Sequence, residues 1–150
     1  MRMTTMILLS ASLLSFAGLI SCKKDSSQTS STSNSQLITQ KAWKYDTRGL
    51  DENNNGTIEA SESDMLSCQS DDTFSFNAHN TGVYNPGSLQ CAPDDVTITF
   101  NWYFSANETE LAIFAYPEKI SKLDADVLEI YHDDQNTQNQ TVKYITRFKH

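Results

Sequence analysis

Large apolar residues recur at every second position through much of this chain. The clearest case is the segment 95–105, where they alternate with mostly polar residues from Val96 to Phe104. A period of two is typical of a β-strand with one buried face. Turn signals such as the Asn-Pro-Gly at 85–87 separate segments of this kind. The pattern predicts strands at 42–47, 73–77, 83–84, 95–105, 110–116, 120–123, 127–131 and 142–148.

These segments amount to about seven or eight short strands, and no stretch shows the long 3.6-residue apolar period of an amphipathic helix. One helix candidate remains, a turn or two at 61–66. Short strands at roughly ten-residue spacing favour a small antiparallel barrel or sandwich. We therefore predict an all-β domain.

The N-terminal segment has a different pattern. An apolar run at 6–20 follows a single basic residue, Arg2, which is the composition of a secretory signal and is too short to span a bilayer. The run ends in Leu-Ile-Ser-Cys, with the cysteine at 22. This ending resembles the lipobox of bacterial prolipoproteins. The resemblance implies cleavage before Cys22, a lipid on its thiol, and a place in a bacterial cell envelope, which we expect to be the outer membrane on its periplasmic or surface face.

Residues 23–36 begin with Lys-Lys-Asp and continue as Ser, Thr, Gln and Asn without an apolar residue. Such a segment buries too little to offset the entropy of ordering, so we expect a disordered tether. The predicted organisation is a signal peptide at 1–21, lipidated Cys22 with the tether to 36, and one domain at 37–150. Two or more acyl chains anchor a protein stably, so no transmembrane helix is needed.

The net charge limits the class of partner, and the cysteine count limits the bonds that the cysteines are expected to form. The formal net charge is −8, and removing Arg2 with the signal would make it −9; this acidity argues against nucleic acid as a partner. Assigning Cys22 to lipid leaves Cys68 and Cys91, for which a disulfide is the expected state in an oxidising compartment. A metal-binding or reactive thiol pair is the alternative, but neither cysteine has a nearby His or a Cys-x-x-Cys partner.

Several signals occur in a characteristic order: an early Trp strand, a Cys before an acidic pair, a Phe-x-Phe-Asn hairpin, a second Cys, a Trp strand and a last strand ending in Phe. The residues concerned are Trp43, Cys68, Asp71, Asp72, Phe74, Phe76, Asn77, Gly82, Tyr84, Cys91, Trp102, Phe104, Leu111 and Phe148. This order resembles the lipocalin-like lipoproteins of Bacteroidota over most of 37–150. Lys41 and Asn80 depart from it, since the family favours Gly at both positions. The resemblance implies a lipocalin-like β-barrel, with Arg147 stacked on Trp43 at one end.

Residues 51–62 match the twelve-residue calcium loop D-x-[DN]-x-[DN]-G-x5-E without a mismatch. Ca²⁺ takes six to eight oxygen ligands, which this spacing wraps around one point. The predicted ligands are the side chains of Asp51, Asn53 and Asn55, the carbonyl of Thr57, and the carboxylates of Glu59 and Glu62. Because Asn-Asn-Asn-Gly is also good turn chemistry, a plain polar turn is the alternative. The low charge predicts a structural site with a Kd of roughly 10⁻⁴–10⁻³ M.

Catalytic motifs are missing from the sequence, which has neither Gly-x-Ser-x-Gly nor His-Glu-x-x-His. We interpret His132 beside Asp133 as a solvated turn pair, and the acidic pairs 71–72 and 94–95 as turn caps near the disulfide. We therefore predict that the protein is not an enzyme.

The aromatic residues either line a pocket for an apolar ligand or fill the core. They are Trp43, Phe74, Phe76, Phe100, Trp102, Phe104, Phe114 and Phe148. The leading hypothesis is an envelope lipoprotein whose barrel binds a small apolar ligand or serves as a surface interaction module. The alternative is a purely structural or protein-binding lipoprotein with a filled core. In both, the membrane is contacted through the lipid anchor alone.

Overall fold

The computed structural model describes residues 32–150. The predicted signal peptide 1–21, Cys22 and tether residues 23–31 lie outside the described residues. The elements in chain order are α1 (Asn34–Ile38), β1 (Trp43–Asp51), η1 (Ser67–Gln69), β2 (Thr73–Asn77), η2 (Ala78–Asn80), β3 (Thr81–Asn85), β4 (Ile98–Phe104), β5 (Glu110–Ile113), β6 (Tyr116–Leu123), β7 (Val127–Gln135) and β8 (Thr141–Lys149).

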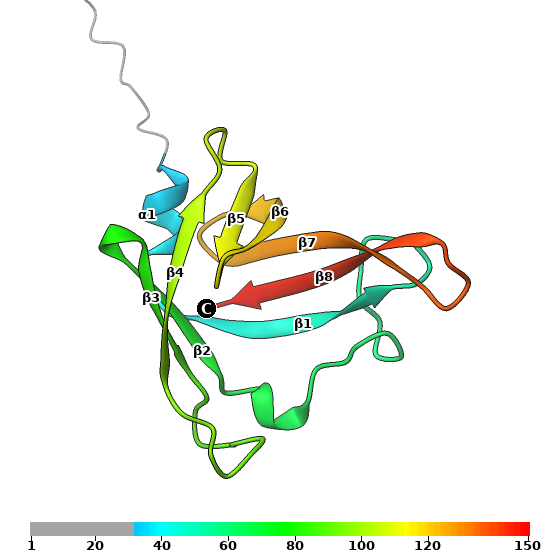
Figure 1. Ribbon diagram of the computed structural model, residues 1–150, viewed down its shortest axis with the longest axis horizontal. Coiled ribbons are helices and arrows are strands. Elements are labelled where there is room, and N and C mark those ends of the chain that lie inside the picture. Colours follow the sequence, from blue (N-terminus) through cyan, green and yellow to red (C-terminus); the bar gives the residue numbers. More distant parts are fainter. Residues whose placement is uncertain (1–31) are drawn as a thin grey trace, which may run out of the picture. The chain divides into compact units, whose positions relative to one another are not determined.

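Eight antiparallel strands pair in chain order and close into a barrel, because β8 returns to pair with β1 (Figure 1). This up-and-down order is that of lipocalin-type barrels, and closure removes the free edges that would otherwise pair with other chains. The predicted all-β antiparallel barrel is confirmed.

The barrel wall is uneven around β1. β1 pairs with β2 through two residues only, Trp43 opposite Phe74 and Lys44 opposite Thr73. Its pairing with β8 continues from Lys44 to Asp51. Beyond Lys44, β1 therefore runs with β8 and β7 as a three-stranded extension, which Figure 1 shows reaching away from the other strands.

Two of the predicted elements differ from those in the structure. The strand expected at 95–105 begins only at Ile98, and Val96 is 65% exposed, because the chain turns at Ala92–Asp95 with the Asp95 N–H donated to the Ala92 carbonyl at 3.1 Å. The helix candidate at 61–66 was wrong. That stretch instead lies along β1, with a bridge between Gly49 and Ser63.

The helix α1 also lay outside the sequence prediction, and it overlaps the end of the expected tether. Ser33 and Gln36 form a capping box, in which the Gln36 N–H donates to Ser33 Oγ at 3.2 Å and the Ser33 N–H donates to Gln36 Oε1 at 3.0 Å. The Ser-x-x-Gln spacing is a known helix start, so the sequence did contain this signal. Helical structure is therefore present on both sides of the predicted domain boundary at 37.

α1 covers the barrel end where β1 starts. Ile38 is fully buried, and the Trp43 indole N–H donates to its carbonyl at 2.8 Å. The ring of His150 packs on Trp43 with centroids 3.8 Å apart. The expected Arg147–Trp43 stack was wrong, because Arg147 alternates with buried Phe148 and faces outward, with Nε 3.1 Å from Glu129 Oε2.

Side chains fill the barrel interior except at the end opposite α1. Its buried cluster is Ile38, Trp43, Phe74, Phe76, Phe100, Trp102, Leu111, Leu128, Ile130 and Phe148. Six of the eight aromatic residues considered in the sequence are therefore core residues, while Phe104 and Phe114 are less buried. No helix within residues 32–150 is long and apolar enough to cross a membrane.

Cys68 and Cys91 form the predicted disulfide, which joins η1 to the loop between β3 and β4. One carboxylate of each acidic pair acts beside it as the predicted turn cap, whereas Asp72 of the first pair is buried and accepts a hydrogen bond from the Tyr84 hydroxyl. Asp71 Oδ2 accepts hydrogen bonds from the Ser88 N–H at 2.7 Å and the Leu89 N–H at 3.2 Å. Asp95 Oδ2 accepts from the Ala92 N–H at 2.9 Å.

A Cys68→Ser/Cys91→Ser variant is expected to lose about 3 kcal/mol of unfolding free energy. The bridge closes a loop between positions 23 residues apart, and its loss returns that entropy to the unfolded chain. Urea titrations of the oxidised wild type and the variant measure the difference. Wild type in dithiothreitol should match the variant; a reduced wild type as stable as the oxidised protein would contradict a stabilising bridge.

Candidate functional site

A pocket opens at the barrel end opposite α1, where the chain turns between β5 and β6. Its volume is about 240 Å³. Apolar side chains form most of its wall, with a carboxylate, a hydroxyl and two phenols among them. The lining residues are Tyr45, Phe74, Ile113, Phe114, Tyr116, Glu118, Ile130, Thr146 and Phe148.

Three aromatic rings pack together in the pocket wall. The ring centroids of Tyr45 and Phe74 are 5.1 Å apart, those of Tyr45 and Phe148 are 5.1 Å apart, and those of Phe74 and Phe148 are 5.3 Å apart. These separations are those of favourable offset and edge-to-face contacts. The rings come from β1, β2 and β8, so this cluster also joins the strands on either side of the short β1–β2 pairing.

The rim of the pocket is the two-residue turn between β5 and β6. Its residues Phe114 and Ala115 have φ values of 52° and 69°. Positive φ at both positions of a two-residue hairpin turn is the type I′ conformation, which is usually formed by Asn-Gly or a similar pair. Phe and Ala are strained there, a condition that clusters at functional sites. The Phe114 ring lies 4.9 Å from Phe100 yet stays 41% exposed.

Polar side chains form a connected network beside the pocket. Arg48 Nε donates to Asp64 Oδ1 at 3.0 Å, and the Tyr144 hydroxyl donates to Asp64 Oδ2 at 2.7 Å. The rings of Tyr144 and His132 stack with centroids 5.1 Å apart. His132 Nδ1 lies 2.9 Å from Glu118 Oε2, which brings the network to the pocket wall.

The sequence interpretation of His132 as a solvated turn residue beside Asp133 was wrong. His132 lies within β7 and its carboxylate partner is Glu118 on β6, 14 residues away. Asp133 faces the opposite side of the strand and pairs with Lys119 at 2.6 Å. A period of two across both strands could have placed the His and the Glu on one face, but not opposite each other.

The contacts within this network determine the pKa values of Asp64 and Tyr144. Partial burial works to raise the pKa of Asp64, but hydrogen bonds from Tyr144 and Arg48 outweigh it, so the Asp64 pKa lies below its usual value of 3.8. Burial and the hydrogen bond to Asp64 raise the pKa of Tyr144 to about 12. At neutral pH the Asp64 carboxylate is therefore charged and the Tyr144 phenol is protonated.

A second carboxylate lies near the open end without an ion-pair partner among the described residues. Asp72 is 2% exposed and accepts a hydrogen bond from the Tyr84 hydroxyl at 2.8 Å. Burial raises the pKa of Asp72, and the bond from Tyr84 offsets only part of that effect. The Asp72 charge acts on Tyr45 of the pocket wall, whose pKa is raised mainly by burial.

The predicted calcium loop folds around its own polar residues. Asp51, which is 1% exposed, accepts the N–H of Asn55 on Oδ1 at 3.0 Å and the N–H of Gly56 on Oδ2 at 2.9 Å. The side-chain amide of Asn53 donates to Glu62 Oε1 at 3.1 Å. The first, third and last ligand positions are thus brought toward one region.

The remaining predicted ligands join the same network. The Asn55 amide donates to Glu59 Oε1 at 3.1 Å, and the Glu59 N–H donates to Glu62 Oε2 at 3.0 Å. Thr57 donates its N–H to Asn55 Oδ1 at 2.8 Å. The loop docks on β1 at Gly49, where any side chain would overlap the Glu62 carbonyl.

The fit to calcium is partial in this arrangement. Within residues 32–150, no group of three or more Asp, Glu, His or Cys side chains is placed to hold a metal ion. The amide nitrogens of Asn53 and Asn55, rather than their oxygens, face Glu62 and Glu59. Turning these amides over would exchange donors for acceptors, and carboxylate oxygens keep a second lone pair. The residue set therefore suits an oxygen-ligated cation once both amides turn.

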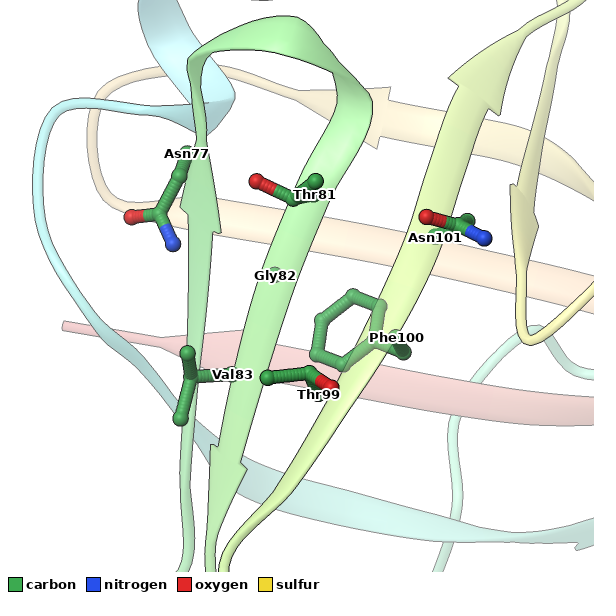
Figure 2. A pocket seen from close by; sticks show the side chains of 7 residues that line it. All are labelled: Asn77, Thr81, Gly82, Val83, Thr99, Phe100 and Asn101. Carbon is green, nitrogen blue, oxygen red and sulfur yellow. The ribbon is translucent and has the colours of Figure 1, made fainter.

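A larger hollow of about 410 Å³ lies over β3 and β4. Figure 2 shows its lining residues: Asn77, Thr81, Gly82, Val83, Thr99, Phe100 and Asn101. Its polar side chains are exposed and uncharged, and a side chain at Gly82 would overlap the Phe100 ring. Because it has few apolar walls to desolvate a ligand, the smaller pocket at the open end is the better candidate.

Comparisons with known proteins add no function. No protein-family model matches the chain, and no curated protein matches it.

The two carboxylates Asp64 and Asp72 should respond oppositely to neutralisation. An Asp64→Asn variant is expected to lose roughly 0.5–1 kcal/mol at pH 7, as for a half-exposed ion pair. Asp72→Asn keeps an acceptor for Tyr84 and removes a poorly solvated charge, so it should be as stable as wild type or more so. Urea titrations at pH 7 compare the two; an Asp72→Asn variant less stable than Asp64→Asn would contradict this.

The contributions of Asp64 and Asp72 to stability should also change with pH in opposite directions. Asp64 has a lowered folded pKa, so its contribution is present above its unfolded value of 3.8 and is lost as the pH falls through the folded pKa. Asp72 has a raised folded pKa, so its cost is present above that pKa and disappears as the pH falls toward 3.8. The stability difference between wild type and each variant should shrink toward low pH in both cases.

Proposed function

We propose that this protein is a non-enzymatic lipoprotein of a bacterial cell envelope, held at the outer membrane by lipid on Cys22, and that its barrel binds a small apolar ligand at its open end. The pocket at that end supports ligand binding. Aromatic and aliphatic side chains from several strands surround it, and a few polar groups converge on its edge. This is the usual make-up of small-molecule sites.

The size of the pocket limits the ligand. Its 240 Å³ exceeds the roughly 150 Å³ that admits benzene. It is smaller than the roughly 300–1,000 Å³ of sites for drug-sized molecules. Because the barrel below is filled by the core cluster, the pocket does not deepen toward α1. A compound of one or two rings fits this space, whereas a long acyl chain does not.

A structural or protein-binding role is the second candidate. The filled core favours it, since most of the barrel interior serves stability rather than capture. Exposed aromatic side chains at the surface, such as Tyr103 and Tyr116, would serve a partner protein under this reading.

Binding of the neutral two-ring fluorophore 2-naphthol tests the ligand hypothesis. The protein is the full chain carrying Cys22→Ser, so that no acyl chain competes for the pocket. We expect saturable binding with a Kd in the micromolar range, and at least about tenfold weaker binding by Thr146→Phe, which places a ring in the pocket.

Thr141→Phe is the matched control, because Thr141 is exposed at the start of the same strand, β8. It should bind the fluorophore as the parent does. Equal binding by both phenylalanine variants would place the fluorophore elsewhere, and no binding by the parent would favour the structural role.

We propose further that residues 51–62 hold a structural Ca²⁺ through Asp51, Asn53, Asn55, Thr57, Glu59 and Glu62. The support is the convergence of these side chains in one hydrogen-bonded loop docked on β1. Such a cation would fasten the long connection between β1 and β2 near its start, while the disulfide fastens it near its end.

Thermal melts in 10 mM calcium and in EDTA test this site. With a Kd near 1 mM, calcium should add about 1.4 kcal/mol and raise the midpoint by roughly 5 °C. Glu62→Gln should abolish the rise. The control Glu52→Gln removes the same charge from a non-ligand position of the loop and should keep it. Identical midpoints of the wild type in calcium and EDTA would reject the site.

A further inference from the structure

We propose that the ligand of the pocket at the open end is an arylalkylamine, a flat system of one or two rings with a side chain that carries a protonated amino group. This inference rests on the proposed ligand-binding function and specifies its chemistry. It follows from the balance of charge around the pocket, the kind of wall it has, and its volume.

Glu118 is the charged group in the pocket wall. Its carboxylate lies 2.9 Å from His132 Nδ1, and no Lys or Arg among the described residues forms an ion pair with it. The imidazole nitrogen contacts the carboxylate from one side only. Each carboxylate oxygen therefore keeps a lone pair that is able to accept a further hydrogen bond. An ammonium group in the pocket would therefore find an acceptor there, and the Thr146 hydroxyl, which also lines the pocket, is a second acceptor.

The surrounding charges also favour a cation. Asp64 and Asp72 both act on Tyr45 of the pocket wall, so three carboxylates lie at this end of the barrel. The positive group among them is Arg48, which Asp64 already neutralises at 3.0 Å. The excess is negative, and the whole chain, at −8, adds to the attraction of cations.

Other cations near this end are directed away from the pocket. Lys119 pairs with Asp133 at 2.6 Å on the outer face of the barrel. Lys143 lies over the Tyr131 ring at 4.6 Å, also on that face. Among residues 32–150, no Lys or Arg lines the pocket itself. A carboxylate ligand such as a fatty acid would therefore meet Glu118 without a compensating cation.

The aromatic walls supply the second half of the recognition. Tyr45, Phe74 and Phe148 form a contiguous ring cluster, and Phe114 stands at the rim. Ring faces attract both flat apolar groups and ammonium groups within about 6 Å of their centroids. The pocket thus has apolar surface for a ring and negative charge for an amine, in a volume that suits about a dozen heavy atoms.

Three indoles of similar size and different charge test the proposal: tryptamine (cationic), 3-ethylindole (neutral) and indole-3-acetate (anionic). Calorimetric titrations at pH 7.5 use the full chain carrying Cys22→Ser. We expect tryptamine to bind at least about tenfold more tightly than 3-ethylindole, and indole-3-acetate to bind more weakly than either. Added salt should weaken tryptamine binding and leave 3-ethylindole binding almost unchanged.

A Glu118→Gln variant should weaken tryptamine binding about tenfold and leave 3-ethylindole binding unchanged. The matched control is Glu108→Gln, which removes the same charge from the turn between β4 and β5 at the opposite end of the barrel. The three indoles on the parent protein decide the question even where Glu118→Gln does not fold.

Failure of this inference is distinguishable from failure of the proposed function. Equal affinity for all three indoles, with 2-naphthol still bound, overturns the preference for amines and leaves an apolar pocket. Tighter binding of indole-3-acetate does the same. Absence of binding by all three indoles and by the fluorophore overturns both.

Discussion

The pairing of the first strand with the last is the constraint on which the rest of this structure depends. It turns seven consecutive antiparallel connections into a barrel and gives β1 most of its backbone partners. Trp43 lies where this closure begins. Its indole is bonded to α1, its ring is covered by His150 beyond the end of β8, and its backbone faces Phe74 of β2. One buried residue thus joins the helix, β2 and the C-terminus.

The positions of both candidate sites depend on the course of β1 after Lys44. Because it leaves β2 after Lys44, its later residues are free to meet the long connection that follows β1. Arg48 meets Asp64 there, and Gly49 contacts the backbone of the loop at 51–62. The aromatic cluster fills the place where β1 and β2 separate, and the same rings form the pocket wall. The geometry of the closure therefore decides where the barrel is solid and where it is hollow.

Local patterns predicted much of this molecule because their physical cause is local. Alternation along a strand gives the all-β class and the buried faces, and a twelve-residue spacing gives the loop at 51–62. The disulfide also followed, from compartment and cysteine count. Alternation misled at Val96, which is exposed and follows a turn at 92–95 instead of pairing in a strand. The capping box of α1 was readable in the sequence but was outweighed by the polar composition around it.

The pocket network was beyond local reasoning for a different reason. Tyr144 and Asp64, which share a hydrogen bond, are 80 residues apart, and each looks ordinary in its own segment. Glu118 and His132 meet only because β6 and β7 pair in a register that contains a bulge between Ile120 and Lys122. Register and bulges determine which side chains face each other, and neither is encoded in the hydrophobic period.

The order in which the strands are synthesised gives the closure a kinetic meaning. Asp46 on β1 and Lys149 on β8 are in contact across 103 residues of chain. The strands from β2 to β8 pair with neighbours that follow directly, so they are able to form hairpins as the chain emerges. β1 is made first and finds its main partner last, and pairing over such long separations is slow. Until then its Trp43 face stays uncovered, which makes this strand the part of the nascent protein that most needs protection from aggregation.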